Sequence, residues 1–154
     1  MDWALFGIFL LGCGAAATTG AMFKPGEWYE DMDKPDWTPP KWVFPAAWMV
    51  LYLCMAAAAA RVAVLDGNAY AMAFYAVQLA FNTLWTPIFF GLKRMGAGLV
   101  VILFLWVTVA ATMLAFFPLD LVAGLLFVPY LAWVTIASAL NFSVWRRSLG
   151  VASD

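Results

Sequence analysis

The residues of this chain that could do chemistry are aromatic rings and amides, because the usual catalytic groups are missing. There is no histidine, which removes the commonest metal ligand and the commonest general base. Cys13 and Cys54 stand alone inside apolar runs, so neither a disulfide framework nor a zinc site is expected. The apolar runs hold no acid–base pair and no nucleophile beside a base. We therefore predict no metal site and no catalytic residue of the ordinary kind.

Aromatic and amide side chains recur at helical spacing in three stretches. Residues three, four, seven and eleven apart share one face of a helix. The three sets are Trp48 and Tyr52; Gln78, Asn82, Trp85 and Phe89; and Tyr130, Trp133, Ala137 and Asn141. Amides in hydrocarbon turn inward to find partners, so Asn82 and Asn141 orient their stripes toward the interior. Such an interior suits a flat apolar ligand, although ordinary core packing with two amide bonds is an alternative.

These stripes require long helices in an apolar solvent, and the composition supplies them. The 154 residues are 66% hydrophobic and 11% charged, whereas a soluble domain is about 45–50% apolar. Five stretches without a charged side chain have the roughly 20 residues that a helix needs to cross a bilayer. We predict an all-α membrane protein: one domain, residues 1–154, forming a bundle of five transmembrane helices with a structured first loop. The expected spans are about 3–23, 42–60, 67–92, 95–117 and 121–145.

The basic residues predict the orientation of the bundle. One side would hold seven of them, namely Lys24, Lys34, Lys41, Lys93, Arg94, Arg146 and Arg147, and the other side only Arg61. The positive-inside rule then places the N-terminus outside, and loop one and the C-terminus in the cytoplasm. Asp2 precedes the first apolar run without a basic residue, so we interpret that run as a retained span. A net charge of −1 gives no reason to expect nucleic acid as a partner.

Loop one, residues 24–41, has the pattern of a lid. Three apolar side chains, Trp28, Tyr29 and Met32, fall on one side of a short helical turn, and acidic residues fall on the other. Prolines stiffen the remainder, which also carries Trp37. Three lysines stand at its base and edges: Lys24, Lys34 and Lys41. They could pair with the carboxylates at the rim of a porphyrin, or they could serve membrane orientation alone.

The third predicted span has a second face made of small residues. Ala69, Ala73, Ala76 and Ala80 follow one another at helical spacing, roughly opposite the Asn82 stripe. Small residues let helix backbones approach closely. The stripe could be a homodimer interface, or it could pack within the monomer against Gly12, Ala16 and Gly20 of the first span.

Several of these residues together resemble the TspO/MBR family, the tryptophan-rich sensory proteins related to the mitochondrial translocator protein. The resemblance covers nearly the whole chain. The motifs are Trp28-Tyr29-x-x-Met32-x-Lys34-Pro35-x-Trp37-x-Pro39-Pro40, Trp48-x-x-Leu51-Tyr52, Asn82-x-x-Trp85-x-x-x-Phe89-Phe90 and Pro129-Tyr130-x-x-Trp133-x-x-x-Ala137-x-x-x-Asn141.

The resemblance implies a five-helix bacterial membrane protein, usually dimeric, that binds porphyrins and haem-like tetrapyrroles without an obligatory cofactor. It also implies binding of isoquinoline-carboxamide and benzodiazepine drugs in one pocket under loop one. Residues lining that pocket would be Tyr29, Trp48, Asn82, Phe89, Trp133 and Ala137. Bacterial members are linked to stress responses and to control of tetrapyrrole and pigment synthesis.

The cholesterol motif of the family is incomplete in this chain. It needs a tyrosine between an aliphatic and a basic residue, and here Phe142 stands between Leu140 and Arg146. The motif is weak even when complete, so tight cholesterol binding is not expected.

Three functions remain in competition at this point. The first is a membrane sensor or carrier that binds porphyrin by stacking and shape. The second, implied by the resemblance, is light-dependent porphyrin degradation through Trp48 and Trp133. The third is transport of lipid or porphyrin, since spans without charges argue against ion transport but not against passage of an apolar solute.

Overall fold

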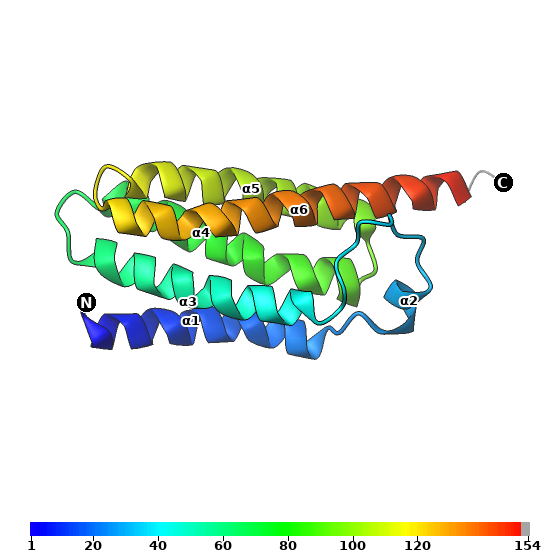
Figure 1. Ribbon diagram of the computed structural model, residues 1–154, viewed down its shortest axis with the longest axis horizontal. Coiled ribbons are helices and arrows are strands. Elements are labelled where there is room, and N and C mark those ends of the chain that lie inside the picture. Colours follow the sequence, from blue (N-terminus) through cyan, green and yellow to red (C-terminus); the bar gives the residue numbers. More distant parts are fainter. Residues whose placement is uncertain (152–154) are drawn as a thin grey trace.

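The computed structural model describes residues 1–151, and every regular element in that part of the chain is a helix (Figure 1). The elements are α1 (Trp3–Met22), α2 (Gly26–Glu30), α3 (Val43–Ala63), α4 (Ala69–Thr86), η1 (Pro87–Gly91), α5 (Met95–Phe116) and α6 (Leu121–Val151). Asp2 starts α1 by accepting a hydrogen bond from the Leu5 amide at 3.0 Å. Each of the five apolar stretches seen in the sequence forms a helix.

The five long helices run up and down and close into a ring. Consecutive members of the order α1, α3, α6, α5, α4 contact one another, and α4 returns to α1. Loop one, with α2, lies at the same end as the last turns of α6, and the N-terminus lies at the other end (Figure 1). We call these the loop-one end and the opposite end. Short connections join α3 to α4, η1 to α5 and α5 to α6.

Four of the described helices are long and apolar enough to cross a membrane: α1, α3, α5 and α6. The remaining long helix, α4, has 18 residues and carries Gln78 and Asn82, which lower its mean hydropathy. These helices make the protein an integral membrane protein of the helical-bundle type. The sequence predicts one uninterrupted span over 67–92, whereas the structure divides that stretch at Pro87.

The division at Pro87 changes the register of the helix. Proline has no amide hydrogen, so the regular hydrogen-bond ladder cannot continue through it. Residues 87–91 form a π-helical turn instead, in which the Leu92 amide donates to the Pro87 carbonyl at 2.9 Å. The wider turn holds an extra residue and rotates the side chains that follow relative to a continuous α-helix.

The opposite end is tied together by polar contacts between the turns. Arg61, in the last turn of α3, pairs with Asp120, which begins α6, at 3.0 Å. Burial alone would raise the pKa of the Asp120 carboxyl. The Arg61 hydrogen bonds and charge, with the Ala123 amide, outweigh that effect and hold the pKa below its usual range. The Asn68 amide donates to the Val62 and Ala63 carbonyls and so closes α3.

The apolar core is densest in the half of the bundle near the opposite end. There α3 buries four alanines, Ala56, Ala58, Ala59 and Ala60, together with Met55 and Val62. The rings of Tyr75, Phe116 and Phe127 pack against one another in the same region. Alanine side chains allow the helix backbones to approach closely, so this half is filled by protein atoms.

Candidate ligand-binding site

A cavity of about 770 Å³ lies beneath loop one, between α1, α3 and the C-terminal part of α4. Pockets that hold small molecules range from roughly 300 to 1,000 Å³. The residues that line the cavity include Cys13, Gly14, Ala17, Lys24, Tyr29, Glu30, Lys41, Phe44, Trp48, Met49, Tyr52, Asn82, Trp85 and Phe90. Gly14, Ala17 and Met49 are also exposed on the bundle surface, so the cavity opens sideways along the seam between α1 and α3.

Aromatic rings form the walls of the cavity. Trp48 stacks on Tyr52, one turn along α3, with ring centroids 5.7 Å apart. Trp85 comes from α4 and Phe90 from η1. Their ring centroids are 5.7 Å apart, and the two rings meet edge to face. Tyr29 descends from α2 and is only 5% exposed. These rings offer both flat faces and edges to a planar ligand, which is the environment that stacking requires.

A chain of hydrogen bonds runs from the cavity wall into the core. The Tyr52 hydroxyl donates to Asn82 Oδ1 at 2.9 Å, and Asn82 Nδ2 donates to the Tyr130 hydroxyl at 2.8 Å. The Tyr130 hydroxyl donates to Gln78 Oε1 at 2.7 Å, and Gln78 Nε2 approaches the Met55 sulfur at 3.8 Å. These bonds satisfy the polar groups that hydrocarbon would leave unpaired. They fix the positions of Tyr52 and Asn82 at the cavity.

A second amide supports the wall from behind. Trp85 Nε1 donates to Asn141 Oδ1 at 3.0 Å, and Asn141 Nδ2 donates to the Met95 carbonyl at 2.9 Å. Asn141 thus joins α4, α5 and α6. The Trp85 ring also stacks on Phe89 with centroids 5.2 Å apart. The orientation of the Trp85 indole is therefore set on both its polar edge and its face.

Loop one forms the roof, and its apolar side faces the bundle. The Trp28 ring lies edge-on to Phe89 and the Tyr29 ring edge-on to Phe90, each with centroids 5.6 Å apart. Burial raises the pKa of the Tyr29 hydroxyl, so it stays protonated at neutral pH. That hydroxyl is buried with no hydrogen-bond partner among the described residues. It can therefore donate to a polar atom of a ligand.

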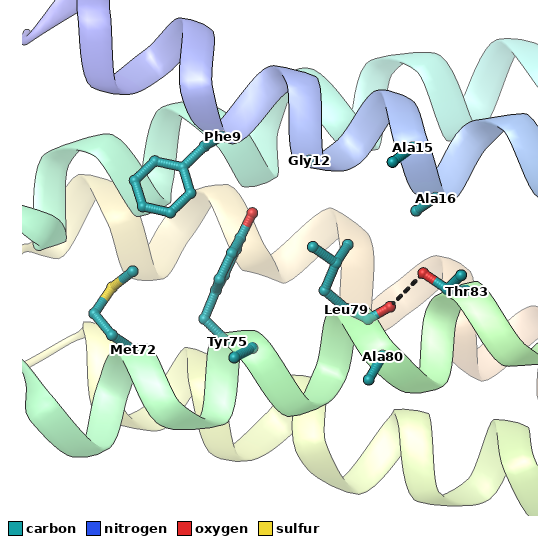
Figure 2. Close-up of a pocket in the computed structure, with 10 residues that line it drawn as sticks. Phe9, Gly12, Ala15, Ala16, Met72, Tyr75, Leu79, Ala80 and Thr83 are labelled. Atoms are coloured by element: carbon teal, nitrogen blue, oxygen red, sulfur yellow. Dashed lines mark hydrogen bonds between the residues drawn. The ribbon is translucent and has the colours of Figure 1, made fainter.

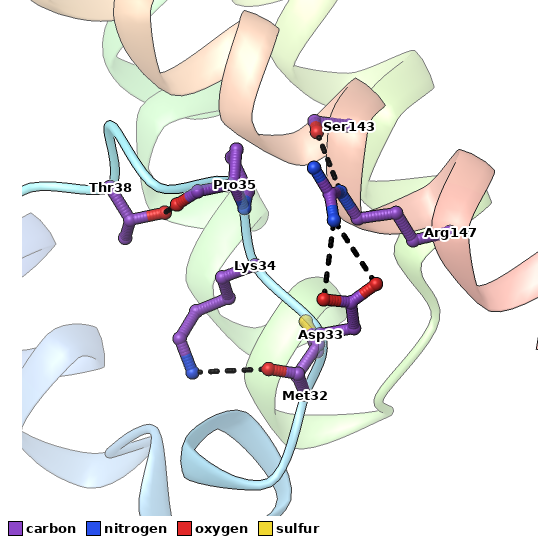
Figure 3. A network of polar contacts seen from close by, with 7 residues as sticks. All are labelled: Met32, Asp33, Lys34, Pro35, Thr38, Ser143 and Arg147. Carbon is purple, nitrogen blue, oxygen red and sulfur yellow. Dashed lines mark hydrogen bonds and ion pairs between the residues drawn. The ribbon is translucent and has the colours of Figure 1, made fainter.

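Two sets of polar contacts hold loop one in place, one within the loop and one between the loop and α6 (Figure 3). Lys34 Nζ donates to the carbonyls of Tyr29 at 2.6 Å, Glu30 at 3.2 Å and Met32 at 3.3 Å. The Arg147 guanidinium of α6 donates to both carboxylate oxygens of Asp33, at 3.2 and 3.1 Å. Lys34 thus shapes the loop, and Arg147 ties it to the end of α6.

A second, separate hollow of about 490 Å³ lies between α1 and α4 (Figure 2). Phe9, Gly12 and Ala16 line it from α1, and Ala76 and Ala80 line it from α4. The four small residues of the α4 stripe, Ala69, Ala73, Ala76 and Ala80, are all exposed. The stripe therefore leaves a groove beside α1 rather than a filled contact. The homodimer interpretation of this face remains a prediction.

The structure divides the twelve binding residues predicted from the sequence into three groups. Five line the cavity: Tyr29, Trp48, Tyr52, Asn82 and Trp85. Six lie behind its walls or roof: Trp28, Phe89, Tyr130, Trp133, Ala137 and Asn141. Of these, Trp133 packs against the lining residue Phe44, with ring centroids 5.5 Å apart, and its Nε1 is buried with no hydrogen-bond partner among residues 1–151. Trp37 is 52% exposed and is not a lining residue.

The residues of the incomplete cholesterol motif do not share a surface. Leu140 is buried and packs in the cluster that contains Tyr29 and Phe89. Phe142 is 44% exposed, and the Arg146 guanidinium lies over its ring at 5.8 Å. The motif therefore forms no single binding face.

The sequence pattern did not indicate the α1 wall or two of the aromatic residues that line the cavity. Cys13, Gly14 and Ala17 line the cavity from α1, and Phe44 and Phe90 complete the aromatic wall. Residues 12–17 of the first span are all small, and this pattern could have indicated a helix face with space for a cavity beside it. Phe89 and Phe90 are adjacent in an apolar stretch, and their spacing alone does not say which of them lines the cavity.

The cavity is lined mainly by apolar and aromatic side chains. The described residues hold no group of three or more histidine, cysteine or acidic side chains that could bind a metal. The cavity supplies flat apolar surface, two anchored polar groups and a charged mouth. These are the elements of a pocket for a planar, mostly apolar molecule.

Comparison with known proteins supplies the remaining evidence. Residues 6–146 match the TspO/MBR family. A protein of Cereibacter sphaeroides named tryptophan-rich sensory protein is 62% identical over 146 residues, covering 95% of this chain and 92% of the relative. Protein CrtK of Rhodobacter capsulatus is 50% identical over 154 residues, covering 97% and 96%. The translocator protein of Homo sapiens is 35% identical over 150 residues, covering 92% and 89%.

Proposed function

The chain belongs to the TspO/MBR family of membrane proteins, and we propose that it binds porphyrins and related tetrapyrroles in the cavity under loop one. The observation that carries this proposal is the 770 Å³ cavity walled by Trp48, Tyr52 and Trp85. Its flat aromatic surfaces suit a macrocycle that is apolar on both faces. Recognition would rest on stacking and shape, so metal-free protoporphyrin would bind as well as haem. The same cavity would take isoquinoline-carboxamide drugs.

The proposal includes the membrane arrangement. The stretch formed by α4 and η1 would be the fifth span, since it runs the length of the bundle beside α5 (Figure 1). The basic residues gather at the loop-one end, so that end would face the cytoplasm and the N-terminus would lie outside. The ligand would then enter from the cytoplasmic half of a bacterial membrane. As a receptor or carrier of this kind, the protein would act in tetrapyrrole metabolism or a stress response.

The test is a titration of protoporphyrin IX into the detergent-purified protein, followed by tryptophan quenching. Trp48→Leu removes a ring from the cavity wall. We expect it to weaken binding about two- to twelvefold, since aromatic pairs contribute about 0.5–1.5 kcal/mol beyond buried area. Trp3→Leu is the matched control because Trp3 is 73% exposed at the opposite end. If Trp48→Leu and Trp3→Leu bind as the unmodified protein does, the cavity is not the porphyrin site.

Photochemical degradation of the porphyrin is a second candidate, favoured by the position of Trp48 on the cavity wall. A bound photosensitiser would then touch an oxidisable indole. Illumination in air should consume porphyrin in the unmodified protein and more slowly in Trp48→Leu at equal occupancy. Equal rates at equal occupancy would remove the protein from the reaction.

A further inference from the structure

The mouth of the cavity carries three charged residues among those that line it: Lys24, Glu30 and Lys41. All three belong to loop one or its base, and all are exposed. The deeper lining is apolar, aromatic or neutral. Any charged group on a bound ligand must therefore be met at this mouth, because an unpaired charge in the apolar interior would cost far more.

The two lysines at the mouth are not equivalent. Lys41 forms an ion pair with Glu30, so the charges of these two side chains largely cancel. Lys24 has no acidic partner within ion-pair distance among residues 1–151. Lys34 cannot substitute for either, because its ammonium group is directed to three loop carbonyls and the Tyr29 ring.

The mouth thus offers one available positive charge, because Glu30 already occupies Lys41. We propose that Lys24 binds a single carboxylate of the ligand, and that Glu30, by occupying Lys41, leaves a second carboxylate without a partner. This inference rests on the proposed function, since it concerns the same cavity. A charge that is left unpaired in the wrong ligand is a common source of specificity between related ligands. The preferred class of ligand is then a planar apolar monoanion.

Protoporphyrin IX and its methyl esters test the proposal directly, because they differ only in charge at the rim. The free acid has two carboxylates, the monomethyl ester has one and the dimethyl ester has none. We expect the monoester to bind about two- to fivefold more tightly than either of the other forms, the range of an exposed ion pair. High salt should reduce these differences, because the mouth is exposed.

Two substitutions separate the roles of the charges. In Lys24→Met, the monoester should bind no more tightly than the dimethyl ester. In Glu30→Gln, the free acid should bind at least as tightly as the monoester, since Lys41 is released and can pair with the second carboxylate. Arg94→Gln is the control for charge at a distance, because Arg94 lies at the loop-one end but does not line the cavity. Far-ultraviolet circular dichroism equal to that of the unmodified protein shows that each variant is folded.

The outcomes distinguish this inference from the proposed function. If no form binds saturably, or if Trp48→Leu affects none of them, the proposed site is wrong. If Trp48→Leu weakens all three forms while the three bind equally and Lys24→Met changes nothing, the porphyrin site stands and the role of Lys24 is refuted. If Arg94→Gln has the same effect as Lys24→Met, the attraction is a general field and the specific contact is refuted.

Discussion

Tyr130 is the position at which the buried hydrogen-bond chain can be broken with the least change in shape. Its side chain is fully buried, and its hydroxyl joins α4 to α6 by accepting from Asn82 and donating to Gln78. Tyr130→Phe keeps the ring and removes both bonds. Hydrogen bonds between membrane helices average about 0.6 kcal/mol and reach about 1.7. Since two are lost and two amide groups are left without these partners, we expect a loss of about 1–3 kcal/mol in the free energy of unfolding.

The measurement is reversible unfolding in mixed micelles as the fraction of sodium dodecyl sulfate rises, followed by circular dichroism. Tyr70→Phe is the matched control, because Tyr70 is 81% exposed on α4. The double variant Tyr130→Phe/Gln78→Leu should lose less than the sum of the single losses, because it removes both ends of one bond. A loss for Tyr130→Phe within about 0.5 kcal/mol of the control, or strict additivity, would refute the chain as a stabilising unit.

Two further predictions concern the ends of the bundle. Asp120→Asn removes the ion pair with Arg61, and thermal unfolding at neutral pH should show a loss of about 1 kcal/mol or less, since both groups are partly exposed. Because the pKa of Asp120 is lowered by folding, its contribution is complete above the unfolded value and is lost as pH falls through the lower folded value. Stability of the unmodified protein should therefore decline below about pH 4, and a variant with the same decline would contradict this. Arg147→Gln removes the tie to Asp33, and amide hydrogen exchange in 31–36 should rise about two- to fivefold; unchanged exchange would show that the pair does not hold the loop.

The amides were the most informative residues in the sequence. In hydrocarbon an amide must find a partner, and Asn82 and Asn141 do so between helices. This requirement fixes the rotation of α4 and therefore the positions of Trp85 and Gln78. Helical spacing alone would have given the same stripe without saying which way it faces.

The sequence could not show which helices line the cavity. Trp133 and Ala137 face inward on α6, yet the cavity lies between α1, α3 and α4. Spacing along one helix identifies a face, but the choice of neighbour depends on packing between helices. The first span is apolar on all sides, so its sequence has no face to assign, and its wall of small residues was missed.

The change of register at Pro87 has a local physical cause, and the regular spacing of residues in the sequence cannot predict it. Periods of 3.6 residues assume an unbroken α-helix, and the π turn adds a residue. Phe89, expected on the cavity wall, lies behind it against Trp28 and Trp85, and Phe90 takes the lining position. A proline within an apolar stretch indicates a break, but it does not say how the helix resumes.

The alanine packing of α3 closes the interior of the bundle beyond the cavity. The cavity walls stop at Leu10 on α1, Leu53 on α3 and Asn82 on α4, and beyond them α3 buries Met55 and the alanines from Ala56 onward. Within the described residues, the lining therefore ends near the middle of α3, and packed protein atoms lie between a molecule bound below loop one and the opposite end of the bundle.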